Sequence, residues 1–537
     1  MPTAPPAKSA TAFKAILEPT MLMSLITDHY YLLLLGSKGE FARFGLQCWR
    51  QNVTARNRQS LLASRLGLGQ NMTMIHQYLQ RNRARFLAEL QQLIRFPSVS
   101  GQPVHQPDVR ACADWLAKHF RHLGLTVTTH KTAGHPIIEA HTPPVAGRPT
   151  VLIYGHYDVQ PAEPLELWHT PPFAPTVRAG KLFARGASDN KGQFFAHVKA
   201  VEALLATKQP LPVNIRFLIE GEEEIGSAEL IKFVKHHARR LRADYVIISD
   251  TGMYGKGWPT LTYATRGIAA FEIRVDGPNR DLHSGVFGGS LANPAMVLSQ
   301  ILAGCVDAKG RVTIPGFYND VRSLTAKERR AWRQLPLNDR RYAAELGAPT
   351  TTGEAGYTTL ERRWARPTFE INGITGGYQG PGGKTIVPAW ATAKITCRLV
   401  PNQNPKIIDQ LVVKHLRRLA PKSVRLTIDS GHYSPPFLTD TEGPGARAAL
   451  AALETAFGRK PVCTREGGTI HILANFQQQL RGEVLVIGLG QTDDNWHSPN
   501  EKMELNNFYR GIAMSAELLQ RLNPAPRPAT RRASPKT

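Results

Sequence analysis

The amino-acid sequence predicts an α/β domain that is doubly wound around a mainly parallel sheet and interrupted by an inserted α+β domain. Three observations support this class. Short runs of Val, Ile and Leu alternate with helical patterns up to about residue 250. After about Leu261 the pattern changes to longer strands with alternating polar and apolar residues. The α/β pattern then returns after Tyr433-Ser-Pro-Pro436, so one domain is split by the insertion.

The first part of the α/β domain has the element order of a doubly wound sheet. An amphipathic helix is predicted from Met72 or Met74, because apolar residues recur there at helical spacing. Strand and helix patterns then alternate, over 110–123 (helix), 125–129, 136–140 and 150–154 (strands), 194–205 (helix), and 213–219 and 245–249 (strands). The last two are compact Ile/Val runs, which are typical of parallel strands buried on both faces.

The rest of the chain completes the predicted organisation. The insertion is expected to hold strands at 268–275, 368–374 and 391–398, a helix at 294–302 and a charged helix at 327–346. A helix at 445–457, a strand at 483–487 and a helix at 505–522 return to the first domain. We therefore predict five segments: an extension over 1–71 that is disordered or not part of the functional protein, the α/β domain over 72–261 and 436–522, the insertion over 262–435, and a disordered basic tail over 523–537.

Composition excludes several classes of protein. Hydrophobic residues make up 42% of the 537 residues, enough for a sizeable core. No stretch approaches the roughly 18 uninterrupted apolar residues that a membrane helix needs, so we expect no membrane partner. The cysteines are scattered and form no Cys-x-x-Cys pair, which excludes a zinc finger and a disulfide scaffold and favours a reducing, cytoplasmic location; they are Cys48, Cys112, Cys305, Cys397 and Cys463.

The formal net charge of +24 has two interpretations. It could attract polyanions or anionic substrates, or it could belong to a basic but otherwise ordinary surface. The basic residues do not fall in dense runs with interleaved aromatic residues, as a nucleic-acid groove would favour. We therefore expect an ordinary surface and no nucleic-acid partner.

Side chains that bind metals gather where the predicted strands end. Ligands of open α/β folds bind beyond the carboxyl ends of the strands, and imidazole and carboxylate groups are ligands of divalent metals. Each residue alone has an ordinary explanation as a loop histidine, a solvated glutamate or a helix N-cap. Four strand ends that all carry such residues, together with a fifth loop near the C-terminus, favour a metal site; the residues are His156, Asp158, Asp189, Glu223, Glu224, Asp250 and His497.

Two of these groups contain residues that are suited to different roles. In His156-Tyr-Asp158, the aspartate can accept the second imidazole N–H and so orient the histidine. Glu223 and Glu224 are adjacent and cannot both point the same way from a strand end. One of them can bind metal while its neighbour faces a substrate as a base.

Six short motifs extend this pattern over the chain from about Met74 to Leu522. They are Gly-His-Tyr-Asp-Val-Gln-Pro (155–161), Arg-Gly-Ala-Ser-Asp-Asn-Lys-Gly (185–192), Glu-Gly-Glu-Glu-Glu-Ile-Gly-Ser (220–227), Asp-Leu-His-Ser-Gly-Val-Phe-Gly-Gly (281–289), Arg-Glu-Gly-Gly-Thr (465–469) and His-Ser-Pro-Asn-Glu (497–501). Through them the chain resembles the carnosinase-like dipeptidases of the co-catalytic zinc metallopeptidase superfamily. That superfamily also includes aminoacylase, succinyl-diaminopimelate desuccinylase and carboxypeptidase G.

The resemblance implies a hydrolase of dipeptides or short peptides with two divalent metal ions per subunit, zinc or manganese. Glu223 matches the general base that activates the water between the metals, and Asp158 matches the residue that orients His156. The implied ligands of one metal are His156, Asp189 and Asp250, and those of the other are Asp189, Glu224 and His497.

The resemblance also assigns roles in the insertion. It implies that the insertion is a lid that makes a homodimer, and that His283 reaches the active site of the other subunit and stabilises the oxyanion. Arg398 matches a residue that binds the substrate carboxylate. Thr385 and Thr469 match further substrate contacts, although ordinary turn residues explain them equally well.

Other functions stay open at this point. A deacylase or amidase of N-acyl amino acids would use the same fold. Asp250, rather than Glu, favours peptides with a free amino end within the superfamily. Ile225 and His471 depart from the family pattern and could alter the wall of the pocket. A third possibility, a basic binding protein without catalysis, is disfavoured because the set of ligands and Glu223 is intact.

Overall fold

The computed structural model describes residues 72–523, so the predictions for residues 1–71 and for the tail beyond 523 lie outside the described residues. The largest sheet in this part of the chain has nine strands in the order β1-β2-β6-β3-β7-β17-β8-β15, with β16 also paired to β8. Its central strands β6, β3, β7 and β17 are parallel, whereas β1, β2 and β15 pair antiparallel toward the edges. The strands are β1 (Thr126–His130), β2 (Ile137–His141), β3 (Thr150–His156), β6 (Asn214–Glu220), β7 (Tyr245–Ile248), β8 (Thr260–Thr265), β15 (Phe437–Leu438), β16 (Val462–Glu466) and β17 (Glu483–Gly488).

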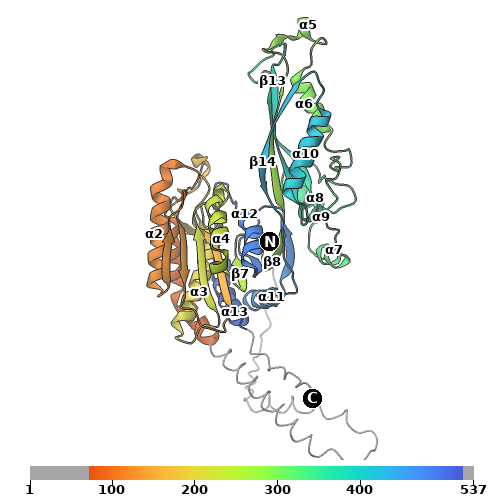
Figure 1. Cartoon of the computed structure of the whole chain (residues 1–537). Helices are drawn as coiled ribbons and strands as arrows, with labels where there is room; N and C mark the ends of the chain where they lie inside the picture. Colours follow the sequence, from red (N-terminus) through yellow and green to blue (C-terminus); the bar gives the residue numbers. More distant parts are fainter. Residues whose placement is uncertain (1–71, 524–537) are drawn as a thin grey trace, which may run out of the picture. The chain divides into compact units, whose positions relative to one another are not determined.

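Helices cover both faces of this sheet (Figure 1). Alternate residues of β3 enter different cores, because side chains of a strand point to opposite faces. Val151 and Ile153 pack in one core, and Leu152 and Tyr154 pack in the other. The first core contains residues of a helix over 72–94 and of α2 (Gln106–His122), α3 (Lys191–Ala206), α11 (Pro444–Phe457) and α13 (Leu505–Arg521), and the second contains residues of α4 (Ala228–Leu241) and α12 (His471–Leu480). The predicted doubly wound α/β class is confirmed.

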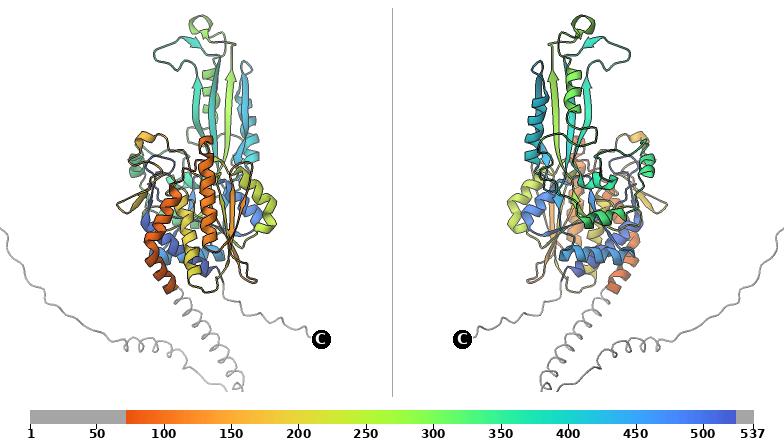
Figure 2. Two further views of the ribbon diagram at one scale, coloured as in Figure 1. Left: turned by 90° about the vertical axis from the view of Figure 1, so that its left-hand side faces the viewer. Right: turned by 90° about the vertical axis from the view of Figure 1, so that its right-hand side faces the viewer.

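A separate antiparallel sheet of four strands lies in the inserted part of the chain. Its order is β11-β13-β9-β14, and its strands are β9 (Gly267–Asp276), β11 (Thr368–Gly376), β13 (Trp390–Leu399) and β14 (Arg425–Ser434). Helices α6 (Pro294–Ala303) and α10 (Pro405–Leu419) lie along it, as Figures 1 and 2 show, and they share a hydrophobic core with its strands. The predicted α+β character of the insertion is therefore confirmed.

The remaining elements are short. They are β4 (Thr176–Arg178), β5 (Lys181–Phe183) and β18 (Lys502–Glu504) in one small sheet, the pair β10 (Leu282–His283) and β12 (Ile386–Val387), helices α5 (Ser284–Phe287), α7 (Ala326–Arg333), α8 (Asp339–Glu345) and α9 (Thr359–Ala365), and the 3-10 helices η1 (Pro103–His105), η2 (Leu165–Leu167) and η3 (Glu223–Ile225).

One sequence prediction in the insertion is wrong. The charged segment 327–346 is not one helix but two, α7 and α8. Pro336 lies between them, and proline lacks the N–H that would continue a helix. The Asn338 side chain then accepts a hydrogen bond from the backbone of Arg341 and caps the start of α8.

The chain crosses between the two large sheets at two narrow points. Strand β8 ends at Thr265 and β9 begins at Gly267, so Arg266 alone separates them. The return lies between Ser434 of β14 and Phe437 of β15. The role of 262–435 as a lid and dimerisation domain stays a prediction. Among the helices of residues 72–523, none combines the length and the apolar character that crossing a membrane requires.

Candidate metal centre

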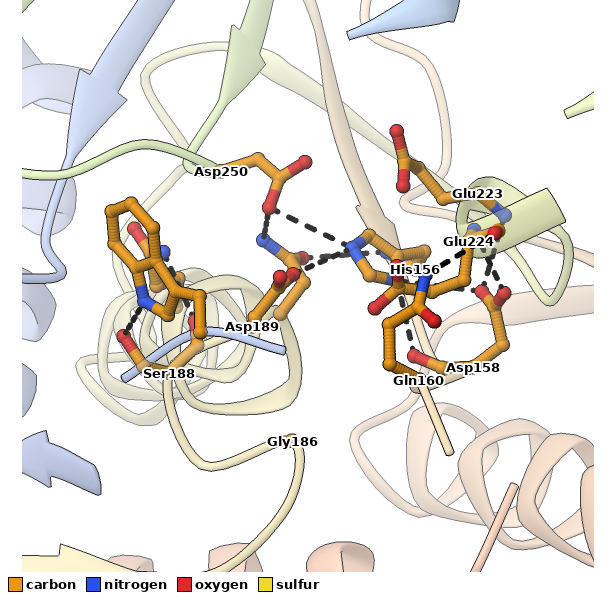
Figure 3. Close-up of polar contacts among 12 residues, drawn as sticks. His156, Asp158, Gln160, Gly186, Ser188, Asp189, Glu223, Glu224 and Asp250 are labelled. Carbon is orange, nitrogen blue, oxygen red and sulfur yellow. Dashed lines mark hydrogen bonds and ion pairs between the residues drawn. The ribbon is translucent and has the colours of Figure 1, made fainter. Parts of the chain in front are cut away.

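Three neighbouring strands bring His156, Glu224 and Asp250 together at the carboxyl ends of the nine-stranded sheet. Strands β6, β3 and β7 run parallel, so their carboxyl ends lie together. His156 is the last residue of β3, and Asp250 follows β7 by two residues. Glu223 and Glu224 lie in η3, directly after β6, and Figure 3 shows these side chains around His156 and Asp189.

All five predicted metal ligands come together in two groups that share Asp189. In one group, Nε2 of His156 lies 3.3 Å from Oδ1 of Asp189 and 3.6 Å from Oδ1 of Asp250. In the other, Nε2 of His497 lies 3.0 Å from Oδ2 of Asp189 and 3.4 Å from Oε2 of Glu224. Asp189 therefore offers one oxygen to each group, as a bridging carboxylate would.

The chemistry of these groups fits divalent metal ions. Nε2 of His156 is buried and has no hydrogen-bond partner, an arrangement that is costly unless a ligand completes it. Burial raises the pKa of the Glu224 carboxyl well above its usual range, and the negative charge of Asp189 raises it further. Burial alone would lower the pKa of His156, but the Asp250, Asp158 and Asp189 carboxylates outweigh it and raise that pKa. A cation in each group would compensate this crowding of negative charge.

A third group of acidic residues and histidine in residues 72–523 has no need of a metal ion to balance its negative charge. Glu89, His119 and Glu202 also lie close enough to share a ligand. However, the ammonium of Lys199 lies 2.9 Å from Nε2 of His119 and 2.8 Å from Glu202, and it also pairs with Glu89. A side chain of the protein thus already supplies the cation there.

Asp158 lies behind the ligands and connects two of them. Its carboxylate lies 3.3 Å from Nδ1 of His156, whose Nδ1 also lies 3.1 Å from the Asp158 backbone oxygen. The same carboxylate accepts backbone N–H bonds from Glu223 (3.3 Å) and Glu224 (3.1 Å) and a hydroxyl bond from Ser100 (2.7 Å). Asp158 therefore fixes both the imidazole ring and the start of η3 (Figure 3).

Glu501 holds the loop that carries Asp189. Its buried carboxylate accepts backbone N–H bonds from Gly186 (2.9 Å), Ser188 (2.9 Å) and Asp189 (3.0 Å), and it pairs with Arg185 at 2.9 Å. The sequence places Glu501 in the His497 motif but predicts no role for it. Its contacts are to backbone groups more than 300 residues away, which only the fold reveals.

Glu223 differs from the other carboxylates of the centre. Within residues 72–523 its side chain takes part in no hydrogen bond or ion pair, and Figure 3 shows its carboxylate pointing away from Asp158. Burial raises the pKa of Glu223 well above its usual range, and the Asp250, Asp189 and Asp158 charges raise it further while His156 opposes them. Glu224, in contrast, accepts a hydrogen bond from Nε2 of Gln160 at 2.8 Å.

The predicted substrate-binding residues and the predicted catalytic residue His283 fall into two pairs. Arg398 and Thr469 meet, because Nη1 of Arg398 donates to the Thr469 hydroxyl at 3.0 Å. His283 and Thr385 are exposed on the β10 and β12 side of the insertion. No hydrogen bond or ion pair of the described chain links either of them to a metal-ligand residue.

One large cavity within residues 72–523 does not belong to the metal centre. A cavity of about 1000 Å³ lies between α7 and the β8–β16 edge of the sheet, with Tyr263, Trp332 and Cys463 among its lining residues. None of the candidate ligands lines it. The convergence of donor atoms, rather than the volume of a cavity, identifies the centre.

Comparison with known proteins agrees with this geometry. Residues 152–521 match the model of peptidase family M20/M25/M40. The chain is 32% identical over 460 residues to the Cys-Gly metallodipeptidase dug1 of Schizosaccharomyces pombe, covering 83% of this chain and 97% of that protein. It is also 32% identical over 460 residues to the Beta-Ala-His dipeptidase of Homo sapiens, covering 82% and 91%. The structure of the M20 family metallo-carboxypeptidase Sso-CP2 from Sulfolobus solfataricus is similar with a TM-score of 0.74 at 32% identity, covering 82% of this chain and 99% of that one.

Replacing Glu501 with Gln should weaken metal binding. The amide would turn an NH2 group toward backbone donors and leave the buried Arg185 without its anion. We expect metal affinity to fall about 10–100-fold, the range typical of residues that support ligands. Titration with a competing chelator measures this. Glu504→Gln is the matched control, because among residues 72–523 Glu504 forms an ion pair only with the partly exposed Lys181. Equal affinities in the two variants would contradict the role of Glu501.

Proposed function

Because the chain belongs to peptidase family M20/M25/M40, we propose that it is a dimeric dipeptidase that uses two divalent metals to hydrolyse the amide bond of dipeptides or short peptides. The observation that supports this most directly is the pair of ligand groups that share Asp189 beside the unengaged Glu223. The Cys-Gly and Beta-Ala-His activities in the names of its relatives favour dipeptide substrates. The cytoplasmic location stays a prediction.

The metals would be held as the two groups suggest, one by His156, Asp189 and Asp250 and the other by Asp189, Glu224 and His497. Zinc or manganese bound there supplies Lewis-acid polarisation of the scissile carbonyl and lowers the pKa of water. The chain contributes the rigidity of the ligands: Asp158 orients His156, and Glu501 holds the Asp189 loop.

Glu223 is the proposed proton carrier. Its carboxylate is not engaged by other side chains, so it can accept a proton from the attacking water and later donate it to the leaving amine. Burial raises its pKa, which favours the protonated form that the second step requires.

Arg398 is proposed to bind the carboxylate of the substrate. The Thr469 hydroxyl donates to the Arg266 backbone oxygen at 2.7 Å and accepts the Arg398 N–H, so it fixes the guanidinium in place. Arginine grips a carboxylate with two parallel hydrogen bonds.

His283 of the partner subunit is proposed to complete the site, with Thr385 beside it. Within one chain His283 is exposed, and its Nδ1 accepts the Gly285 backbone N–H at 2.9 Å. The proton of the neutral ring must then lie on Nε2, which is free to donate to the oxyanion that develops during attack.

A substrate panel tests the proposed activity. The metal-reconstituted enzyme should hydrolyse Cys-Gly, β-Ala-His and Ala-Ala faster than N-acetyl amino acids. Glu223→Gln should keep its metal and lose turnover by about 10²–10⁴-fold, the usual contribution of a general base. Faster hydrolysis of N-acetyl amino acids would instead favour a deacylase, near-normal turnover of Glu223→Gln would contradict its role, and tight polyanion binding without metal would favour a binding protein.

Subunit mixing tests the role of His283. His283→Ala should lower kcat while the metal content stays unchanged, because His283 lies in neither ligand group. If active sites are shared, mixing His283→Ala with Glu223→Gln subunits should restore part of the activity, since one mixed site has both residues intact. No recovery after subunit exchange has been verified by mass spectrometry would contradict sharing.

A further inference from the structure

Two arginines lie close together at the first crossing between the sheets, and neither has an ion-pair partner within residues 72–523. Arg266 is the single residue between β8 and β9, and Arg398 of β13 pairs with Ile268 of β9. Arg266 is two residues from Ile268, and the charge of Arg398 acts on the Arg266 guanidinium, so the two side chains lie near one another. The Thr469 hydroxyl links them, since it bonds to the backbone of one and to the guanidinium of the other.

Both guanidinium groups are held in place by a hydrogen bond, but most of their N–H donors have no acceptor within residues 72–523. Nε of Arg266 donates to the Gly467 backbone oxygen at 2.9 Å, and Nη1 of Arg398 donates to Thr469. These are their only side-chain hydrogen bonds within the described chain. A guanidinium has five N–H donors, so each retains most of its capacity for a ligand.

The electrostatic surroundings favour an anion at this place. Burial, together with the neighbouring charge of Arg398, lowers the pKa of Arg266 to about 10. The nearby carboxylates of Glu370 and Glu466 oppose this effect, but neither forms an ion pair with the arginines. Two partly buried positive charges without partners are unfavourable. One carboxylate would neutralise only one of them.

His471 supplies a third polar group that has no partner. It begins α12, two residues after Thr469, and its Nδ1 is buried without a hydrogen bond. Burial and the charge of Arg398 lower its pKa. The ring is therefore neutral at pH 7 and can donate or accept one hydrogen bond.

We propose that Arg266 and Arg398 together bind a C-terminal residue that carries two carboxylates, so that the enzyme prefers dipeptides ending in Glu or Asp. Arg398 takes the α-carboxylate, Arg266 takes the side-chain carboxylate, and Nδ1 of His471 adds a hydrogen bond in the same subsite. This inference rests on the proposed function.

Comparison of Ala-Glu with Ala-Gln tests the subsite, because the two substrates have nearly the same shape. The wild type should favour Ala-Glu in kcat/KM by about 10–100-fold, the worth of a hydrogen bond to a charged group. Arg266→Gln should remove this preference, and Arg266→Lys, which keeps the charge, should retain part of it. Arg274→Gln is the control, because it removes a positive charge from β9 that already pairs with Asp276. An equal rate for both substrates in the wild type, or an unchanged ratio in Arg266→Gln, would overturn the proposal.

A binding experiment separates this inference from the proposed activity. Calorimetry on the metal-loaded protein should show tighter binding of L-glutamate than of L-glutamine, and Arg266→Gln should abolish the difference. Tighter glutamate binding without dipeptide hydrolysis would support the subsite and refute the proposed function. Dipeptide hydrolysis with equal binding of the two amino acids would refute the subsite and leave the function intact.

Discussion

The candidate centre depends on one carboxylate, that of Asp189, which faces a histidine on each side. His156 approaches one of its oxygens and His497 the other, at 3.3 and 3.0 Å. These two histidines pull the pKa of Asp189 below its usual range although burial alone would raise it. Ionised Asp189 is therefore the fixed negative charge around which the other candidate ligands are arranged.

The fold fixes that position from several directions at once. The parallel strands β3 and β7 bring His156 and Asp250 together at their carboxyl ends. The Asp189 loop is held by the Glu501 carboxylate through three backbone N–H groups. Asp158 does the same for η3. Buried carboxylates that accept backbone hydrogen bonds thus hold both loops in position beside the candidate ligands.

Much of this arrangement could be predicted from the sequence. His156, Glu224 and Asp250 belong to motifs that follow β3, β6 and β7, and strand ends of a parallel sheet converge by a general rule. Asp189 and His497 lie in loops, and the resemblance of their motifs to the family assigned them to the same site. Glu501 and Ser100 could not be given roles, because their partners are distant in sequence and are backbone groups or a buried carboxylate. The proximity of Arg266 to Arg398 could not be predicted either, because it depends on the register of β13 against β9. Pro336 indicates the break between α7 and α8, but the helical periodicity on both sides of it favoured one continuous helix.

The most direct test of the account is the metal content of ligand variants, measured by elemental analysis after reconstitution. The wild type should bind two metals per chain. His497→Ala should retain about one, because the His156 group stays intact, whereas Asp189→Ala should retain less than one, because both groups lose a ligand. Equal metal content in the Asp189 and His497 variants, or only one metal in the wild type, would contradict a centre built on a shared Asp189.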